Sequence, residues 1–161
     1  MKSILLIALI ILISHFSLYS QDETSYISPG VTIAWDLSGN FILSPKLSFG
    51  YFKNKVFYNI TLGFSASKDN FFYYIEPQFG VLSKLSEAKK TQIFSGAGVG
   101  INYHPEKTSN PLSFRTSVFC GYIAFLKATI ITKDSVNVDF GLETVLPIPL
   151  NFKLDFGSPG G

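Results

Sequence analysis

From Ile27 onward, apolar or aromatic residues alternate with small or polar residues along most of the chain. The segment Phe41–Phe52 (FILSPKLSFGYF) shows the pattern clearly, because its odd positions are apolar and Lys46 lies among the small and polar residues. A period of two residues is typical of a β-strand whose two faces meet different surroundings. The alternation therefore predicts strands, and it leaves open whether the large faces lie inside or outside the fold.

Eight alternating segments follow one another, separated by polar turns or loops. They are residues 27–37, 41–52, 56–67, 71–83, 93–104, 112–132 (one long strand, straight or bent), 136–145 and 150–156. A strand needs about 9–11 residues to cross a membrane at a tilt, and most of these segments are long enough. Short connections and an even strand number predict an all-β fold, a closed up-and-down antiparallel β-barrel of about eight strands that spans a membrane. We expect Leu146–Leu150 to form the last turn.

The first 20 residues have a different character. Lys2 precedes ILLIALIILI (Ile4–Ile13), an apolar run that is shorter than the roughly 20 residues of a transmembrane helix. A positive start, a short apolar run and small residues after it are typical of a secretory signal peptide. We expect residues 1–20 to be cleaved off and residues 21–161 to form a single barrel domain.

Eight charged residues of the segments indicate which face meets the membrane, because each of these eight lies on the small, polar face of its strand. They are Asp36, Lys46, Glu76, Arg115, Asp139, Glu143, Lys153 and Asp155. A Lys or Arg that faces the hydrocarbon midplane costs a barrel about 2–4 kcal/mol, whereas opposite charges can pair inside. We therefore expect the large residues to face lipid and a set of charged residues to form an interior network. This network consists of Lys46, Glu76, Arg115, Asp139 and Glu143.

The alternative is a soluble periplasmic barrel of lipocalin type, with the large residues inside. Its outer surface would then consist of Ser, Thr and Gly with about one charge per strand, whereas soluble surfaces usually carry about 25–35% charged residues. Rows of Phe, Tyr and Leu would also overfill the interior of eight strands. Both arguments favour the membrane-spanning barrel.

Aromatic residues on the large faces gather near the strand ends. They are Trp35, Phe41, Tyr51, Tyr58, Phe71, Tyr73 and Tyr103. Transmembrane barrels carry such aromatic girdles at both membrane interfaces, so we predict that these seven residues form a girdle.

The composition limits the other functions. Charged residues make up only 15% of the chain, against about 25% in soluble domains. A net charge of +2 gives no reason to expect nucleic acid as a partner. One Cys, Cys120, and one His after the signal peptide do not make a transition-metal cluster, and we expect no cofactor.

In strand number, alternation and signal peptide, residues 27–156 resemble the small outer-membrane β-barrels, the group that includes the OmpA membrane domain and OmpX. The resemblance is one of architecture and rests on no specific motif. It implies the outer membrane of a diderm bacterium, both chain ends in the periplasm, and insertion by the barrel-assembly machinery. Family members typically end on an aromatic residue, a role that Phe156 could fill although Gly-Ser-Pro-Gly-Gly follows it. We expect outer-membrane lipid as the surrounding partner and a monomeric protein.

His104 is the one candidate for catalysis. Barrels that deacylate or palmitoylate lipid A resemble this size class and use a His with a Ser and an acidic partner. Ser113 and Glu143 are candidates for these partners, but no His-x-Ser motif is present, and we expect His104 to lie exposed at the rim.

The predicted function is a non-enzymatic outer-membrane barrel with a polar, largely plugged interior and a structural or surface-interaction role. The alternatives are a soluble periplasmic barrel that binds an apolar ligand, or a lipid A-modifying enzyme that uses His104.

Overall fold

The computed structural model describes residues 23–68, 70–86, 91–107, 109–122, 124–133 and 135–150. The expected signal peptide and all but the first residue of the segment 150–156 lie outside the described residues. No helix within these ranges is long and apolar enough to cross a membrane.

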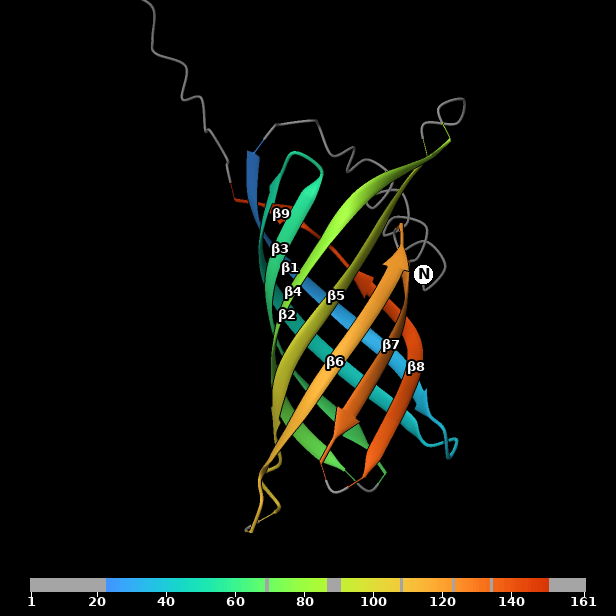
Figure 1. Ribbon diagram of the computed structural model, residues 1–161. Coiled ribbons are helices and arrows are strands. Elements are labelled where there is room, and N and C mark those ends of the chain that lie inside the picture. The colour runs from blue at the N-terminus through green and yellow to red at the C-terminus, as the bar shows by residue number, and fades with distance from the viewer. Residues whose placement is uncertain are drawn as a thin grey trace, which may run out of the picture.

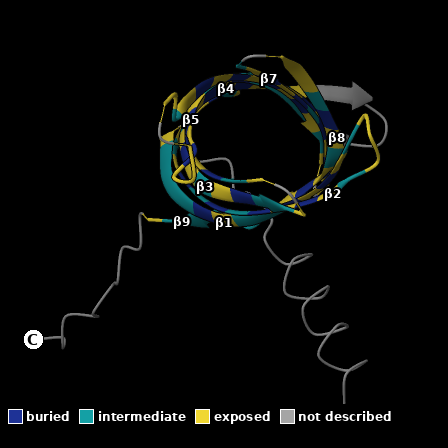
Figure 2. Ribbon diagram, turned by 90° about the horizontal axis from the view of Figure 1, so that it is seen from below, coloured by how far each residue is buried: buried dark blue, intermediate teal, exposed yellow. Residues whose placement is uncertain are grey.

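Eight strands form the wall of a closed barrel. They are β1 (Glu23–Asp36), β2 (Phe41–Lys53), β3 (Val56–Ser67), β4 (Phe71–Ser86), β5 (Thr91–Tyr103), β6 (Leu112–Gly121), β7 (Ala124–Thr132) and β8 (Val136–Val145). Each strand pairs antiparallel with the next, and β8 also pairs with β1, so the sheet has the form of a ring in Figure 2 and of an upright barrel in Figure 1. The predicted closed, up-and-down antiparallel barrel of eight strands is therefore confirmed.

The prediction of one long strand over residues 112–132 is wrong, because this segment is the hairpin of β6 and β7. The two strands pair from Phe114 opposite Thr132 to Gly121 opposite Phe125. The alternation continues in phase through the turn, because paired residues of an antiparallel hairpin lie on the same face of the sheet. Apart from Gly121, the turn has none of the residues that usually mark one, so the sequence pattern did not show it.

The chain end is also arranged differently from the prediction. β8, and not residues 150–156, closes the barrel against β1. Leu146–Leu150 does not turn back. Instead, the short strand β9 (Ile148–Pro149) continues along β1, where it pairs with Tyr26 and Ile27. Two prolines in this stretch cannot donate ladder hydrogen bonds, which explains the break between β8 and β9.

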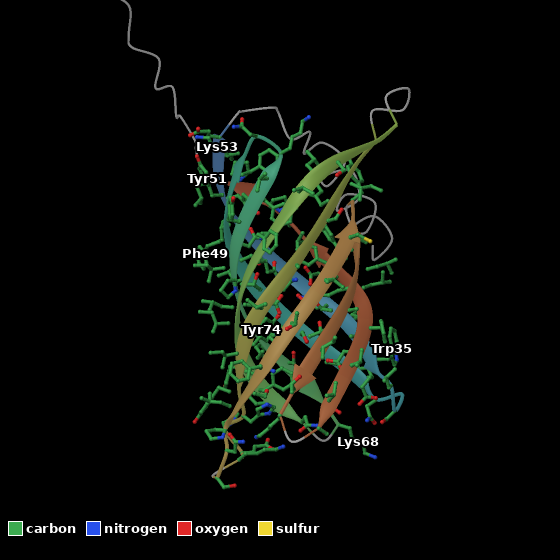
Figure 3. The ribbon with its side chains drawn as sticks, viewed as in Figure 1. Trp35, Phe49, Tyr51, Lys53, Lys68 and Tyr74 are labelled. Atoms are coloured by element: carbon green, nitrogen blue, oxygen red, sulfur yellow. The ribbon has the colours of Figure 1, made fainter. Side chains whose placement is uncertain are left out.

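The large residues of the alternating pattern point outward and the small ones inward. Trp35, Phe49 and Tyr51 lie on the outer side of the wall in Figure 3, whereas Tyr74 lies within the barrel. Exposed apolar side chains cover the outer face of every strand of the wall, and examples are Leu43, Ile60, Ile75, Val99, Val118, Ile130, Leu142 and Ile33. The outer wall therefore has the apolar belt of a transmembrane barrel.

The interior also contains large apolar residues, which the sequence analysis did not place there. Phe57, Phe119 and Phe125 form one buried cluster, with Phe52, Phe94 and Val145 packed against it. A second buried cluster consists of Phe72, Tyr74 and Ile131. The first lies beside the β2–β3 and β6–β7 turns, and the second lies beside the β3–β4 and β7–β8 turns at the opposite end. The polar interior is thus bounded by aromatic side chains at both ends.

Glycines of the inner face make room for these rings. A Cβ added at Gly63 would lie 2.6 Å from the Tyr74 ring, and one added at Gly96 would lie 2.6 Å from the Phe119 ring. At Gly100 the close side chain is that of Arg115, 3.1 Å away. Absent Cβ atoms therefore let both aromatic and charged side chains fit inside a narrow barrel.

Candidate functional site

The middle of the barrel interior holds six charged side chains that are buried from solvent. Five of them are the residues that the sequence analysis assigned to the interior, namely Lys46, Glu76, Arg115, Asp139 and Glu143. The sixth is Lys127 of β7, which the sequence analysis missed. All six project from alternating positions of β2, β4, β6, β7 and β8, on the face opposite the apolar belt.

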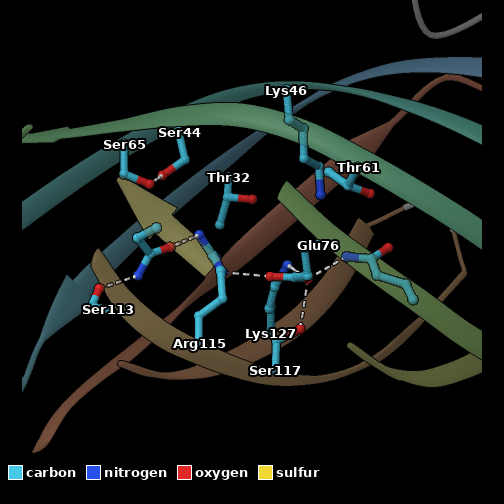
Figure 4. A network of polar contacts seen from close by, with 12 residues as sticks. Thr32, Ser44, Lys46, Thr61, Ser65, Glu76, Ser113, Arg115, Ser117 and Lys127 are labelled. Carbon is cyan, nitrogen blue, oxygen red and sulfur yellow. Dashed lines mark hydrogen bonds and ion pairs between the residues drawn. The ribbon is translucent and has the colours of Figure 1, made fainter. Parts of the chain in front are cut away.

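Five of the charges form one chain of alternating sign, and Figure 4 shows the part of it in which Glu76 lies between Arg115 and Lys127. Lys46 pairs with Glu143, and Lys127 Nζ lies 3.2 Å from Glu143 Oε2 and 3.0 Å from Glu76 Oε1. Arg115 Nε lies 2.5 Å from Glu76 Oε2. Each carboxylate therefore has two cationic neighbours, and these attractions offset the large cost of removing the charges from water.

Lys127 was overlooked because it lies in the second half of the segment that was taken as a single strand. Its inward neighbours Phe125 and Ile131 are large, so β7 shows no clear difference between a small and a large face. The net charge of the expected interior residues was the signal that could have revealed Lys127. The five expected residues carry a net charge of −1, and a narrow apolar-walled barrel requires a partner for that charge. Lys127 brings the sum of the six to zero.

Neutral side chains complete the surroundings of Glu76, which is fully buried. Ser117 Oγ donates to Glu76 Oε1 at 2.8 Å, and Gln78 Nε2 donates to the same oxygen at 2.5 Å. The guanidinium of Arg115 also lies over the Tyr74 ring, 3.9 Å from its centroid. With Oε1 hydrogen-bonded and a cation on each side, Glu76 is held as a carboxylate acceptor.

Asp139 stands apart from this chain, and within the described ranges it forms no ion pair. It borders a cavity of about 20 Å³ whose lining also includes Arg115, Tyr74 and Thr32. This volume is enough for about one water molecule. Asp139 therefore balances the charge of the interior without direct contact with a cation.

His104 follows the last residue of β5 and is buried, so the expectation of an exposed rim position is wrong. The reason is its phase, since His104 continues the inward face of Gly100 and Asn102. Its Nε2 lies 2.9 Å from Ser113 Oγ, and its ring packs against Phe72 with centroids 5.0 Å apart. Burial and the nearby cations Lys133 and Lys107 lower the pKa of His104.

The structure brings together only part of the catalytic set that the sequence analysis considered. Ser113 is next to His104, but Glu143 belongs to the ion-pair chain and accepts a hydrogen bond from Thr32. In the described part of the chain no carboxylate bonds to His104, and no group of three or more His, Cys, Asp or Glu side chains could hold a metal ion. Cys120 is a free thiol exposed on the outer face of β6.

The seven aromatic residues assigned to a girdle all lie on the outer face, near strand ends. Tyr51 and Tyr58 flank the β2–β3 turn, at the same end as the start of β1. The other five lie at the opposite end, and these are Trp35, Phe41, Phe71, Tyr73 and Tyr103. Two edge-to-face contacts order this second group, with Trp35 and Phe41 centroids 5.8 Å apart and Phe71 and Tyr73 centroids 5.0 Å apart.

Comparison with known proteins bears on the fold. The outer membrane enzyme PagL is similar in structure, with a TM-score of 0.59 and 11% identity over 75% of this chain and 99% of PagL. The designed transmembrane barrel TMB2.3 gives a TM-score of 0.46 at 13% identity over 77% of this chain and 96% of its own. The Yersinia pestis outer membrane protein Ail gives a TM-score of 0.38 at 11% identity over 76% of this chain and 99% of Ail. Neither a family model nor a curated protein sequence matches the chain.

With its closed eight-stranded wall, this protein therefore has the architecture of the small outer-membrane barrels.

Proposed function

We propose that this protein is an outer-membrane β-barrel of a diderm bacterium with a closed, charge-neutral interior and a structural or surface-interaction role in the envelope, without catalysis. The observation that carries the proposal is the separation of side chains across the wall. Six charged residues of the strands are buried inside, whereas apolar side chains cover the middle of the outer face. Lipid is the surrounding in which this distribution has the lowest free energy.

The outward belt argues against the soluble alternative. A periplasmic barrel with an apolar ligand needs the large residues inside, but Ile60 is 51% and Phe79 61% exposed on the outer face. Soluble monomers rarely expose contiguous apolar patches larger than a few hundred Å², and this belt surrounds the whole barrel. We infer that outer-membrane lipid covers it, that the barrel-assembly machinery inserts it, and that the protein is a monomer.

The contents of the interior support closure to solutes. Eight strands enclose a space that side chains can just fill, and here two aromatic clusters bound a continuous chain of ion pairs. The cavity beside Asp139 has room for about one water molecule. A barrel with a structural role requires no passage for solutes through its interior.

Fractionation and flux measurements test the proposal together. We expect the mature protein in the outer-membrane fraction, with a gel mobility that changes on heating, and we expect vesicles that contain it to retain small ions and dyes. Recovery of a folded, monodisperse protein without detergent would favour the soluble barrel. Rapid ion release from the vesicles would contradict a closed interior.

A lipid-modifying enzyme is the second candidate, and one contact favours it. His104 Nε2 lies 2.9 Å from Ser113 Oγ, which is the distance between a base and a nucleophile that it activates, and PagL is described as an enzyme. The buried position of both residues argues against contact with a lipid substrate. Mass spectra of lipid A from cells with His104→Ala or Ser113→Ala decide the question, with Thr116→Ala on the outer face of β6 as control. We expect unchanged spectra in all three, and a loss of one lipid A species in the first two alone would establish the enzyme.

A further inference from the structure

The small cavity beside Asp139 lies in the barrel interior, between strands β1 to β4 on one side and β6 to β8 on the other. Its volume of about 20 Å³ is enough for about one water molecule. Cavities of this size that stay dry are lined by apolar groups, whereas most of the side chains around this one are polar. They are Thr32, Ser44, Ser65, Tyr74, Arg115, Lys127, Thr129 and Asp139, together with the apolar Ala34 and Ile42.

The carboxylate of Asp139 borders this cavity without a partner of its own. Only 9% of the surface of Asp139 is exposed. Within the described ranges, its carboxylate forms no ion pair and accepts no hydrogen bond from a side chain. A carboxylate that is buried without a donor is costly, so a donor in the cavity would stabilise the fold.

The two cations that border the cavity have N–H groups that could bond to a molecule inside it. Lys127 has three N–H groups, and its two carboxylate partners engage two of them. Arg115 has five, of which the pair with Glu76 and the bond to Asn102 engage two. Neither cation lies within ion-pair distance of Asp139. A molecule that both accepts and donates hydrogen bonds would connect them.

We propose that the cavity is the binding site of one ordered water molecule, which links the Asp139 carboxylate to Arg115 and Lys127. The water accepts from the two cations and donates one hydrogen to Asp139. Its second hydrogen goes to Thr32 Oγ1, which can accept because it donates its own hydrogen to Glu143 Oε2 at 3.2 Å. Four such neighbours satisfy a water molecule fully. This inference goes beyond a closed structural barrel, because closure of the interior requires no bound water.

The charges of the interior favour a neutral ligand in the cavity. The ion-pair chain holds three cations and two carboxylates, so its net charge is +1. Asp139 brings the sum to zero. A halide or a metal ion in the cavity would leave one or more charges unbalanced in the barrel interior, which is costly. Water fits both the volume and the charge of the site.

A crystal structure of the purified protein, at a resolution that orders buried water, tests the site directly. We expect a density peak within hydrogen-bond distance of one Asp139 Oδ atom and of at least one of the two cations. Crystals grown with bromide in place of chloride should show no anomalous signal at this position. A dry cavity or a bromide signal would overturn the proposal.

A substitution that fills the cavity tests the role of the water by the sign of its effect. Ala34→Val adds two methyl groups at the cavity lining. If water is bound, they expel it and Asp139 loses its donor, so the urea midpoint of unfolding in lipid vesicles should fall. Filling a dry cavity would leave the midpoint unchanged or raise it. Ala128→Val makes the same change on the outer face of β7 and is the control, with little change expected.

An Asp139→Asn background separates loss of water from overpacking. Asparagine keeps the size of the side chain, but a neutral amide loses less than a carboxylate when its water is expelled. Ala34→Val should therefore lower the midpoint less in this background than in the wild-type protein. Equal falls in the two backgrounds would assign the effect to overpacking and would contradict the proposal. If Ala34→Val does not fold, the wild-type crystal structure decides the question.

Discussion

Glu76 is the residue on which the interior ion pairs converge. It forms ion pairs with Arg115 and Lys127 and accepts hydrogen bonds from Lys127, Ser117 and Gln78, and none of its surface is exposed. Its position could be predicted from the alternation of β4. Its partners could not all be predicted, because Lys127 comes from a strand whose inward and outward residues are similar in size. Strand adjacency also does not identify pairs that meet across the interior of a barrel.

Loss of the carboxylate at position 76 should destabilise the barrel strongly. Glu76→Gln keeps the size of the side chain but leaves Arg115 without its ion-pair partner and Lys127 with only Glu143. Breaking a buried pair in this way typically costs about 3–5 kcal/mol. Reversible urea unfolding in lipid vesicles measures this cost. Lys53→Gln breaks the exposed pair with Glu23 and serves as the control, with little change expected. Equal stability of the two variants would contradict the role of Glu76.

At the scale of elements, hairpins with clear turn residues were predicted well, whereas the β6–β7 hairpin was not predicted. The β2–β3 hairpin shows the physical reason, because Asn54 and Lys55 form its two-residue turn with φ of 48° and 69°. Positive φ at both positions is typical of a type I′ turn, and Asn is one of the few residues that tolerate it. The β6–β7 turn contains Tyr122 and Ile123 in place of such residues, so pairing along the strands and not turn chemistry determines where it bends.

The β2–β3 turn offers a stabilising substitution. Lys55 has a side chain at a φ that favours glycine, and a single left-handed residue costs about 1–2 kcal/mol. Lys55→Gly removes this strain and should raise the free energy of unfolding by about 0.5–1 kcal/mol after the greater flexibility of glycine in the unfolded chain is counted. Lys55→Ala removes the same charge without removing the strain and should give no gain. Equal gains in both variants would attribute the effect to the charge.

For the molecule as a whole, the fold depends on which face of the wall meets the hydrocarbon. The one-sided placement of charges in the sequence was enough to predict the outward apolar belt, since a two-residue period assigns each side chain to a face without any knowledge of its partners. The aromatic clusters inside the barrel could not be predicted in this way. Phe57, Phe72 and Phe119 lie at positions that alternation assigns to the small face, and they fit only because glycines of neighbouring strands lie beneath some of these rings.

An outward apolar belt also predicts how an introduced charge on the outer face changes the free energy of unfolding at different membrane depths along one strand. Leu62 lies on the outer face near the middle of β3, whereas Tyr58 lies on the same face near its start. In a bilayer, Leu62→Arg should cost about 2–4 kcal/mol and Tyr58→Arg only about 0–1 kcal/mol, because arginine near the interface can reach water. Urea unfolding in vesicles gives both values. For a soluble barrel, a charge at either position would face water and the difference between the two variants would vanish. A cost that depends on depth therefore distinguishes lipid from water as the surrounding of the apolar belt.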